Sequence, residues 1–170
     1  GDYVIASCYN ALPLGGGGYT LPRLRYGTIA ASCSSLEEML NDVMPKVIES
    51  QLSMMDKKIR FTVEEVPFFK THFLVKEGFI KRENFTGMVG MVGLADAVNH
   101  FLKLEGLNET FGSSKRGDEI GLAIMKLHED KVEAHEGLYC EGTNNKYLLH
   151  AQVGAQISEE DKRNTPAHRV

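Results

Sequence analysis

Apolar side chains recur at helical spacing in the stretch that follows Ser35. The residues Ser35-Leu-Glu-Glu38 have the spacing of a capping box, in which serine and glutamate side chains satisfy free amides at a helix start. The apolar positions after it recur every three or four residues as far as Met55, which predicts a helix with one buried face. Pro45 lies inside this stretch, so we expect a kink there or two helices that meet.

Shorter patterns predict further elements along the chain. Two more helices are expected at 68–77 and 118–136, the second with acidic residues in its first turn, where the helix dipole favours them. Runs of β-branched and apolar residues predict strands at 3–8, 59–66 and 147–153, and we expect the first of these strands to be buried. The chain is therefore expected to mix helices with strands.

Glycines indicate two places where the backbone approaches another group closely. The segment 86–104 is predicted to be a helix in which Gly87, Gly90 and Gly93 recur every third residue. Each glycine inside a helix lowers the stability of the helix by about 1 kcal/mol relative to alanine. Three glycines therefore indicate either a helix that packs closely against a sheet or a helix that starts later in the segment. A glycine-lined wall beside a pocket is the second interpretation. The run 15–18 is predicted to be an irregular loop in close contact with its neighbours.

Composition and charge exclude several classes of protein. The 170 residues are 42% hydrophobic and 25% charged, which fits one globular region long enough to bury a core. A net charge of −4 disfavours nucleic acid and anionic lipid as partners, and no run of about 20 apolar residues could span a membrane. Three cysteines without a C-x-x-C motif argue against a disulfide framework or a zinc ribbon. We therefore expect a cytoplasmic protein.

Two common binding motifs are absent, and a metal site has weak support. The segment 112–117 has the glycine spacing of a phosphate-binding loop, but Asp118 stands where that motif needs lysine. The four-glycine run lacks the strand–loop–helix context of a dinucleotide site. His128 and His135 lie seven residues apart on one predicted helix, with Cys140 shortly after. A metal needs three or four convergent ligands, so we interpret both histidines as a solvated helix surface.

The three cysteines differ in their sequence context. Cys33 lies just before a predicted helix, whose N-terminus could lower the pKa of its thiol, and Cys140 lies at a predicted turn. Cys8 ends the first predicted strand and precedes the glycine run, so its thiol could be held rigidly at a strand tip and face a cavity. A buried structural cysteine is the other interpretation of each.

Three segments carry motifs that occur together in one enzyme family. GDYVIASCYNAL, at 1–12, is similar to the strand that leads into that family's active-site cysteine. TGMVGMVGLADAVNHFL, at 86–102, is similar to its glycine-rich helix. YLLHAQVGAQISEEDKRNTPAHR, at 147–169, is similar to its strand followed by an Asn-Thr-Pro-x-x-Arg loop. Nearly the whole chain thus resembles the glycyl radical enzymes of the pyruvate formate-lyase superfamily, and most of all their YjjI-like branch.

The resemblance implies a fold and a set of site residues. The fold is then an α/β one, a portion of a ten-stranded glycyl radical enzyme barrel with flanking helices. The chain is expected to be a single central region of that barrel, without the Arg-Val-x-Gly-aromatic motif whose glycine stores the radical. Cys8 matches the cysteine that becomes a thiyl radical and takes hydrogen from a small-molecule substrate. Ser7, Tyr9, Asn10 and Gly17 are expected to shape or bind that substrate.

The resemblance also implies partners and leaves the reaction open. No directly bound cofactor or metal is expected; a radical S-adenosylmethionine activating enzyme would install the glycyl radical, and a homodimer is left open. Ser7 replaces the second cysteine that carries the acyl group in pyruvate formate-lyase. Asn10 replaces the glutamate base of many dehydratase and lyase members, and an amide cannot accept a proton at neutral pH. Two alternatives are an anaerobic nucleotide-reductase-like enzyme and a non-catalytic module that binds a small ligand.

Overall fold

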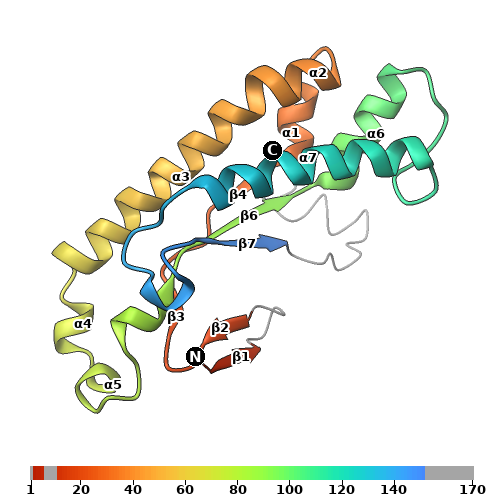
Figure 1. Ribbon diagram of the computed structural model, residues 1–170. Helices are drawn as coiled ribbons and strands as arrows, with labels where there is room; N and C mark the ends of the chain where they lie inside the picture. Colours follow the sequence, from red (N-terminus) through yellow and green to blue (C-terminus); the bar gives the residue numbers. More distant parts are fainter. Residues whose placement is uncertain (1, 6–10, 152–170) are drawn as a thin grey trace, which may run out of the picture.

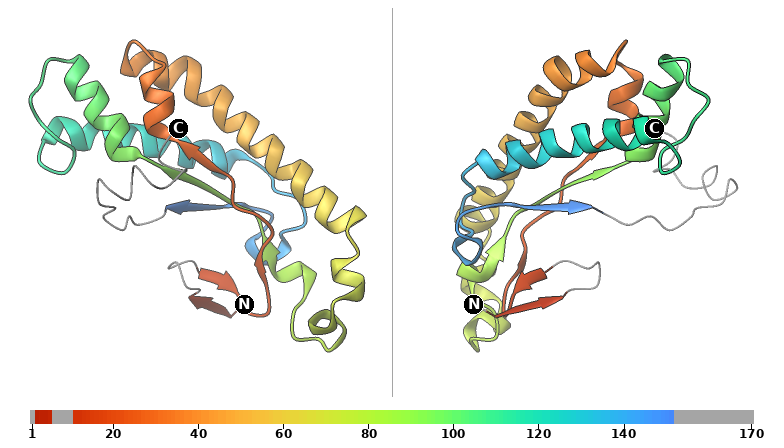
Figure 2. Two further views of the ribbon diagram at one scale, coloured as in Figure 1. Left: turned by 180° about the vertical axis from the view of Figure 1, so that it is seen from behind. Right: turned by 45° about the vertical axis from the view of Figure 1, so that its right-hand side comes forward.

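The longer helices form a layer on one side of the central strands (Figure 1). Figure 1 shows the computed structural model of the chain, which describes residues 2–5 and 11–151. The helices α1 (Tyr26–Ala31), α3 (Met44–Arg60), α6 (Leu94–Leu104) and α7 (Lys115–Ala134) lie on one side of the strands β4 (Arg23–Arg25), β6 (Met88–Val92) and β7 (Leu148–Ala151) (Figures 1 and 2). The hairpin of β1 (Tyr3–Ile5) and β2 (Ala11–Pro13) lies on the other side. This mixed content with small sheets agrees with the α/β class, whereas the ten-stranded barrel stays a prediction. Within the described residues, no helix combines the length and apolar character needed to cross a bilayer.

The elements have the following bounds. The strands are β1 (Tyr3–Ile5), β2 (Ala11–Pro13), β3 (Gly17–Gly18), β4 (Arg23–Arg25), β5 (Phe85–Thr86), β6 (Met88–Val92) and β7 (Leu148–Ala151). The α-helices are α1 (Tyr26–Ala31), α2 (Leu36–Glu38), α3 (Met44–Arg60), α4 (Phe68–Thr71), α5 (Phe73–Lys76), α6 (Leu94–Leu104) and α7 (Lys115–Ala134). Two π-helical segments (Met39–Val43 and Phe61–Glu65) and two 3-10 turns (Arg82–Asn84 and Glu141–Thr143) complete the description.

The central sheet is parallel, and its strands follow chain order. β4 pairs with β6 and β6 with β7, both in parallel. Parallel neighbours need a crossover connection, which is usually helical. Helices α1 to α5 lie between β4 and β6 in the chain, and α6 and α7 lie between β6 and β7. β3 and β5 add a short parallel pair next to this sheet, and β1 pairs with β2 as an antiparallel hairpin.

One face of the central sheet forms the core with the helices. In β6, Val89 and Met91 are buried and alternate with Gly90, because successive residues of a strand point to opposite faces. Leu24 of β4 and Leu149 of β7 pack against the same core. The helices contribute Met, Ile, Leu, Val and Phe side chains with almost no exposed surface. The core therefore lies between the sheet and the helix layer.

A chain of buried polar side chains crosses this core. The Gln51 side-chain nitrogen donates to the carbonyls of Pro22 and Gly90, each at 3.0 Å. Its oxygen can only accept, so the His128 Nε2 at 2.9 Å carries the hydrogen, and His128 Nδ1 accepts from the Tyr26 hydroxyl. His128 is fully buried, so its interpretation as part of a solvated surface was wrong. Burial lowers the pKa of His128 to about 4 and raises that of Tyr26 above its usual range.

The long predicted helix forms with a local adjustment before its proline. The Ser35 side chain accepts from the Glu38 amide at 3.1 Å, as in a capping box, although the Glu38 carboxylate bonds Ser34 instead of Ser35. A π-helical segment joins α2 to α3 without a break, so the missing amide of Pro45 falls where the regular α-helical hydrogen bonding is already interrupted. The π-helical segment is the junction that was expected near Pro45. The helix then continues to Arg60, which is further than predicted.

Two segments adopt a different structure from the one predicted. The segment 59–66 is not a strand, because it continues α3 and then forms a π-helical turn. The segment 86–104 is half strand and half helix, since β6 precedes α6, which starts at Leu94 after Gly93 in the left-handed region (φ 75°). The first half is a strand because it lies between two parallel neighbours, β4 and β7. The alternative of a helix that starts later was therefore right.

The glycines of this segment do pack closely, but inside a sheet. A Cβ on Gly87 would lie 2.6 Å from the ring of Tyr147 and 3.0 Å from Ile59. A Cβ on Gly90 would lie 3.0 Å from the backbone oxygen of His150 and 3.2 Å from the side chain of Arg23. These contacts support the packing interpretation over a glycine wall beside a pocket.

The buried His128 predicts a loss of stability in acid. Its pKa of about 4 in the fold lies below the value of about 6.5 in an unfolded chain, so the unfolded state takes up the proton first. The contribution of His128 to the free energy of unfolding should therefore fall by about 3 kcal/mol as the pH drops from about 6.5 to about 4. Denaturant titrations at a series of pH values measure it.

The matched variant is His128→Gln, whose amide can bond the same two partners without titrating. The difference in unfolding free energy between the original protein and this variant should shrink or reverse by about 3 kcal/mol between pH 6.5 and pH 4. A difference that stays constant over this range would show that His128 does not titrate on unfolding.

Candidate functional site

Most of the predicted site residues lie in one short segment. Ser7, Cys8, Tyr9 and Asn10 belong to residues 6–10, which lie outside the described residues, as does the Asn-Thr-Pro-x-x-Arg segment near the C-terminus. Their roles therefore stay predictions. The structure does describe the strands that flank this segment, and it describes the glycine run, including Gly17.

The hairpin β1–β2 holds both ends of this segment. Ile5 pairs with Ala11 in antiparallel register, so residues 6–10 connect two neighbouring strand ends. At the other end of the hairpin, the Leu14 amide donates to the carbonyl of Asp2 at 2.8 Å. The hairpin thus has a closed base and carries the candidate segment between its paired ends.

The first strand exists as predicted but is not buried. Tyr3 is 54% exposed, Val4 40% and Ile5 77%. A two-stranded ribbon cannot cover both of its own faces, and the helices that form the core lie on the far side of the central sheet. The expectation of a buried strand was wrong for these described residues. One side-chain bond ties the strand to the body, from the Tyr3 hydroxyl to the carbonyl of Gly142 at 3.1 Å.

The glycine run follows the hairpin and packs against residues 84–86. Gly15 has a left-handed backbone (φ 70°), and Gly17 and Gly18 form the short strand β3, so the run is not wholly irregular. A Cβ on Gly16 would lie 1.8 Å from the backbone oxygen of Asn84, which no side chain could tolerate. A Cβ on Gly17 would meet the ring of Phe85 at 3.1 Å. The predicted close approach is confirmed, and the partner is protein: backbone at Gly16 and the Phe85 side chain at Gly17.

One face of the central sheet lies on the same side as the hairpin. Arg23, Gly90 and His150 are register partners across β4, β6 and β7, so their side chains point to one face, opposite the buried Val89. Burial and the neighbouring charge of Arg23 both lower the pKa of His150. This face therefore combines a cationic side chain with a histidine that favours its neutral form.

The two described cysteines are free, buried and unreactive by their surroundings. Burial raises the pKa of Cys33, whose thiol donates to the carbonyl of Ile29 at 3.3 Å at the end of α1. The helix N-terminus therefore does not lower the pKa of this thiol, and the interpretation of Cys33 as a buried structural residue holds. Burial raises the pKa of Cys140 to about 11, and the residue lies at a turn as predicted. Both thiols stay protonated near neutral pH, which disfavours them as nucleophiles.

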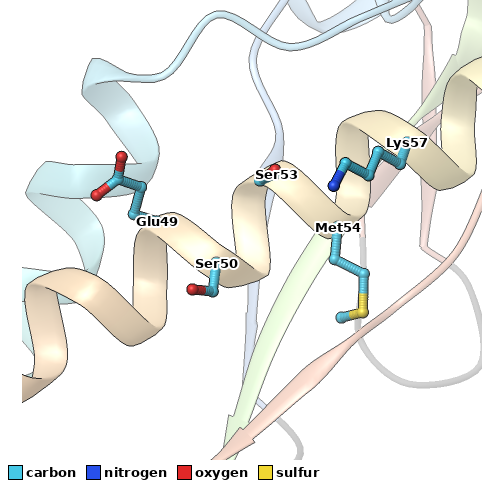
Figure 3. A pocket seen from close by; sticks show the side chains of 5 residues that line it. All are labelled: Glu49, Ser50, Ser53, Met54 and Lys57. Atoms are coloured by element: carbon cyan, nitrogen blue, oxygen red, sulfur yellow. The ribbon is translucent and has the colours of Figure 1, made fainter.

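A second group of polar side chains, His135, Asp56 and Tyr147, connects the helix layer to the segment before β7. His135 Nε2 contacts Asp56 at 3.0 Å, and the Tyr147 hydroxyl donates to the same carboxylate at 2.6 Å. In the part of the chain that the structure describes, no three His, Cys, Asp or Glu side chains converge as a metal site. A shallow pocket follows the exposed side of α3 (Figure 3). All of its lining residues come from that helix, so it does not adjoin the hairpin: Glu49, Ser50, Ser53, Met54 and Lys57.

Comparison with known proteins gives a consistent picture. The family model described as "Glycyl radical enzyme YjjI-like" matches residues 1–170. An "Uncharacterized protein" of Haemophilus influenzae is 63% identical over 169 residues, which are 99% of this chain and 33% of that protein. The "Uncharacterized protein YjjI" of Escherichia coli strain K12 is 37% identical over 170 residues, which are all of this chain and 32% of that protein. The chain thus spans about a third of the length of these relatives.

The contact at Gly16 predicts that no larger residue is tolerated there. Gly16→Ala places a methyl group on the Asn84 carbonyl, so the run must move away from its partner strand, at a cost of about 3 kcal/mol in unfolding free energy. Gly106→Ala is the control, because its Cβ would meet nothing and only its left-handed backbone (φ 75°) adds strain of about 1–2 kcal/mol. Chemical denaturation compares the two. Equal losses would mean that the glycine run can shift freely.

Proposed function

Because the chain belongs to the YjjI-like glycyl radical enzyme family, we propose that it is the part of a glycyl radical enzyme on which the thiyl radical forms. The observation that carries the proposal is the family match over residues 1–170. It is supported by the position of Cys8 in the sequence, within residues 6–10, which connect the paired strands β1 and β2. A hairpin fixed at its base can present a thiol at a constant position. The described cysteines, Cys33 and Cys140, are buried in the helix layer or its turn and suit this role poorly.

The proposed chemistry is a sequence of reversible hydrogen-atom transfers. A glycyl radical elsewhere in the protein takes the hydrogen atom of the Cys8 thiol, so that a C–H bond forms, the S–H bond breaks and the unpaired electron moves to sulfur. The thiyl radical then takes a hydrogen atom from a C–H bond of the substrate, which restores the thiol and leaves a substrate radical. After rearrangement, the product radical takes a hydrogen atom from Cys8, which becomes a thiyl radical again. This thiyl radical takes its hydrogen atom back from the glycine or begins another turnover, so the cycle consumes no external oxidant or reductant.

The neighbours of Cys8 are proposed to position a small-molecule substrate. Asn10 offers both a donor and an acceptor and can orient a polar substrate group, but it supplies no base. Ser7 and Tyr9 carry hydroxyl groups beside it, and Gly17 lies on the run that leads from the hairpin to the sheet. Ser7 has no thiol, so acyl transfer through a second cysteine at that position does not belong to the proposal.

The arrangement of the central sheet supports a barrel wall. β4, β6 and β7 are parallel neighbours in chain order, and α1, α3, α6 and α7 of the two crossovers lie on one side of them. An α/β barrel is built in this way, whereas a doubly wound sheet reverses direction and covers both faces with helices. We propose that the face carrying Arg23 and Gly90 lines the interior and that the hairpin projects into it. The rest of the barrel and the radical glycine would come from other parts of the protein.

Partners follow from the same chemistry. A glycyl radical has to be generated by an external hydrogen abstraction, for which a radical S-adenosylmethionine activating enzyme is the proposed partner. The chain itself needs no metal or bound cofactor in this scheme. A homodimer is compatible with the proposal and is not required by it.

The proposal predicts that Cys8→Ser separates radical formation from radical use. In the full-length protein, activated without oxygen, the glycyl radical should still form, because the activating enzyme acts on glycine directly. Thiol hydrogens exchange with solvent, so in D2O each passage of the radical to Cys8 and back can place deuterium on the glycine. In the electron paramagnetic resonance spectrum, the splitting of the glycyl radical signal by the glycine hydrogen should narrow with time in the original protein, as deuterium replaces that hydrogen. This narrowing should be absent in Cys8→Ser, because a serine O–H bond is too strong for the glycyl radical to oxidise.

Cys33→Ser is the matched control, since it makes the same change in a thiol that is buried at the end of α1. Its spectrum should narrow at the rate of the original protein. Narrowing at the full rate in Cys8→Ser, or none in the original protein, would overturn the assignment of Cys8.

A further inference from the structure

The hairpin β1–β2 is attached at its base to a segment from a distant part of the chain. The Asn84 side-chain nitrogen donates to the carbonyl of Leu14 at 2.8 Å, and the Lys81 amide donates to the carbonyl of Gly15 at 2.9 Å. The backbone oxygen of Asn84 fills the space beside Gly16 where a side chain would be. The chain leaves the hairpin through these residues, so Asn84 contacts it from two directions.

The segment that contains Asn84 also packs against the turn at Glu141–Thr143. Arg82 pairs with Glu141 through two hydrogen bonds, at 2.8 and 3.1 Å. The buried Thr86 hydroxyl bonds the hydroxyl of Thr143 at 2.9 Å. A Cβ on Gly142 would lie 2.9 Å from the carbonyl of Glu83, so the turn at Glu141–Thr143 packs directly on this segment. These contacts prevent the segment around Asn84 from following a movement of the hairpin.

The turn also reaches the hairpin directly. The Tyr3 hydroxyl donates to the Gly142 carbonyl at 3.1 Å, and Gly142 packs near Pro13 of β2. The hairpin base is thus fixed by one side-chain bond on each strand side, through Tyr3 and through Asn84. β1 and β2 have three residues each, or about 10 Å of strand, so a displacement at the base is passed on to the ends that hold residues 6–10.

We infer that Asn84 is a positioning residue for the hydrogen transfer at Cys8, acting through Leu14 and the hairpin. The inference rests on the function proposed above. Atom transfer requires the reacting atoms to be in contact, and a displacement of about 1 Å can lower a rate by about a hundredfold. Asn84 is only half-buried, and its truncation removes one side-chain hydrogen bond, which contributes little to stability. Its effect on radical transfer should therefore exceed its effect on folding.

The test uses the full-length, anaerobically activated protein and the narrowing of the glycyl radical signal in D2O. Asn84→Ala should accumulate the radical normally but slow the narrowing by about tenfold or more. Tyr3→Phe removes the second anchor without loss of volume at an exposed side chain, so it tests the same idea if Asn84→Ala folds poorly. It should also slow the narrowing. Asn108→Ala makes the same truncation in the exposed loop between α6 and α7 and should leave the rate unchanged.

The outcomes separate the two proposals. If Cys8→Ser stops the narrowing while Asn84→Ala and Tyr3→Phe narrow at the original rate, the positioning role is wrong and the function of Cys8 stands. If Cys8→Ser narrows like the original protein, the proposed function fails and the inference fails with it. Equal slowing in Asn84→Ala and Asn108→Ala would show a general sensitivity to truncation, which also overturns the positioning role.

Discussion

The fold depends on how backbone carbonyls are satisfied where the helices meet the central sheet. Gln51 donates to the carbonyls of Pro22 and Gly90 at the point where β4 and β6 begin to pair, and the Gly90 amide donates to Pro22. His128 and Tyr26 complete the chain from α7 and α1. Leaving one of these buried groups unpaired would cost about 1–3 kcal/mol. Directional hydrogen bonds, as well as apolar contacts, therefore fix the orientation of helices α1, α3 and α7 relative to the strands.

The central sheet separates the packing side of the molecule from the side proposed for chemistry. On the helix side, Val89 and Met91 complete an apolar core. On the other side lie Arg23, Gly90 and the hairpin, with exposed strand residues. Residues on the hairpin side of the sheet can therefore be substituted without changing the core, because alternate residues of each strand point to opposite faces.

The supports of the candidate site come from three distant parts of the chain. The cysteine motif and the glycine run are visible in the sequence, and the close approach of the run was predicted from glycine alone. No motif at Asn84 or Gly142 indicates these roles, which depend on contacts with Leu14 and Tyr3 across long stretches of chain. No local pattern could have found them. Asparagine and glycine are common in turns, so the residue types of Asn84 and Gly142 indicate no more than a turn at each position.

The sequence by itself determined the amphipathic helices, the capping at Ser35 and the resemblance that led to the family, because periodicity and short motifs are local properties. Tertiary structure decided the rest. The segment around Gly90 is a strand because β4 and β7 flank it, and 59–66 is helical because it continues α3. His128 is buried because Tyr26 and Gln51, 102 and 77 residues away, satisfy its ring nitrogens. Partners this distant along the chain leave no periodic trace, and the free energy of satisfying a buried polar group depends on them.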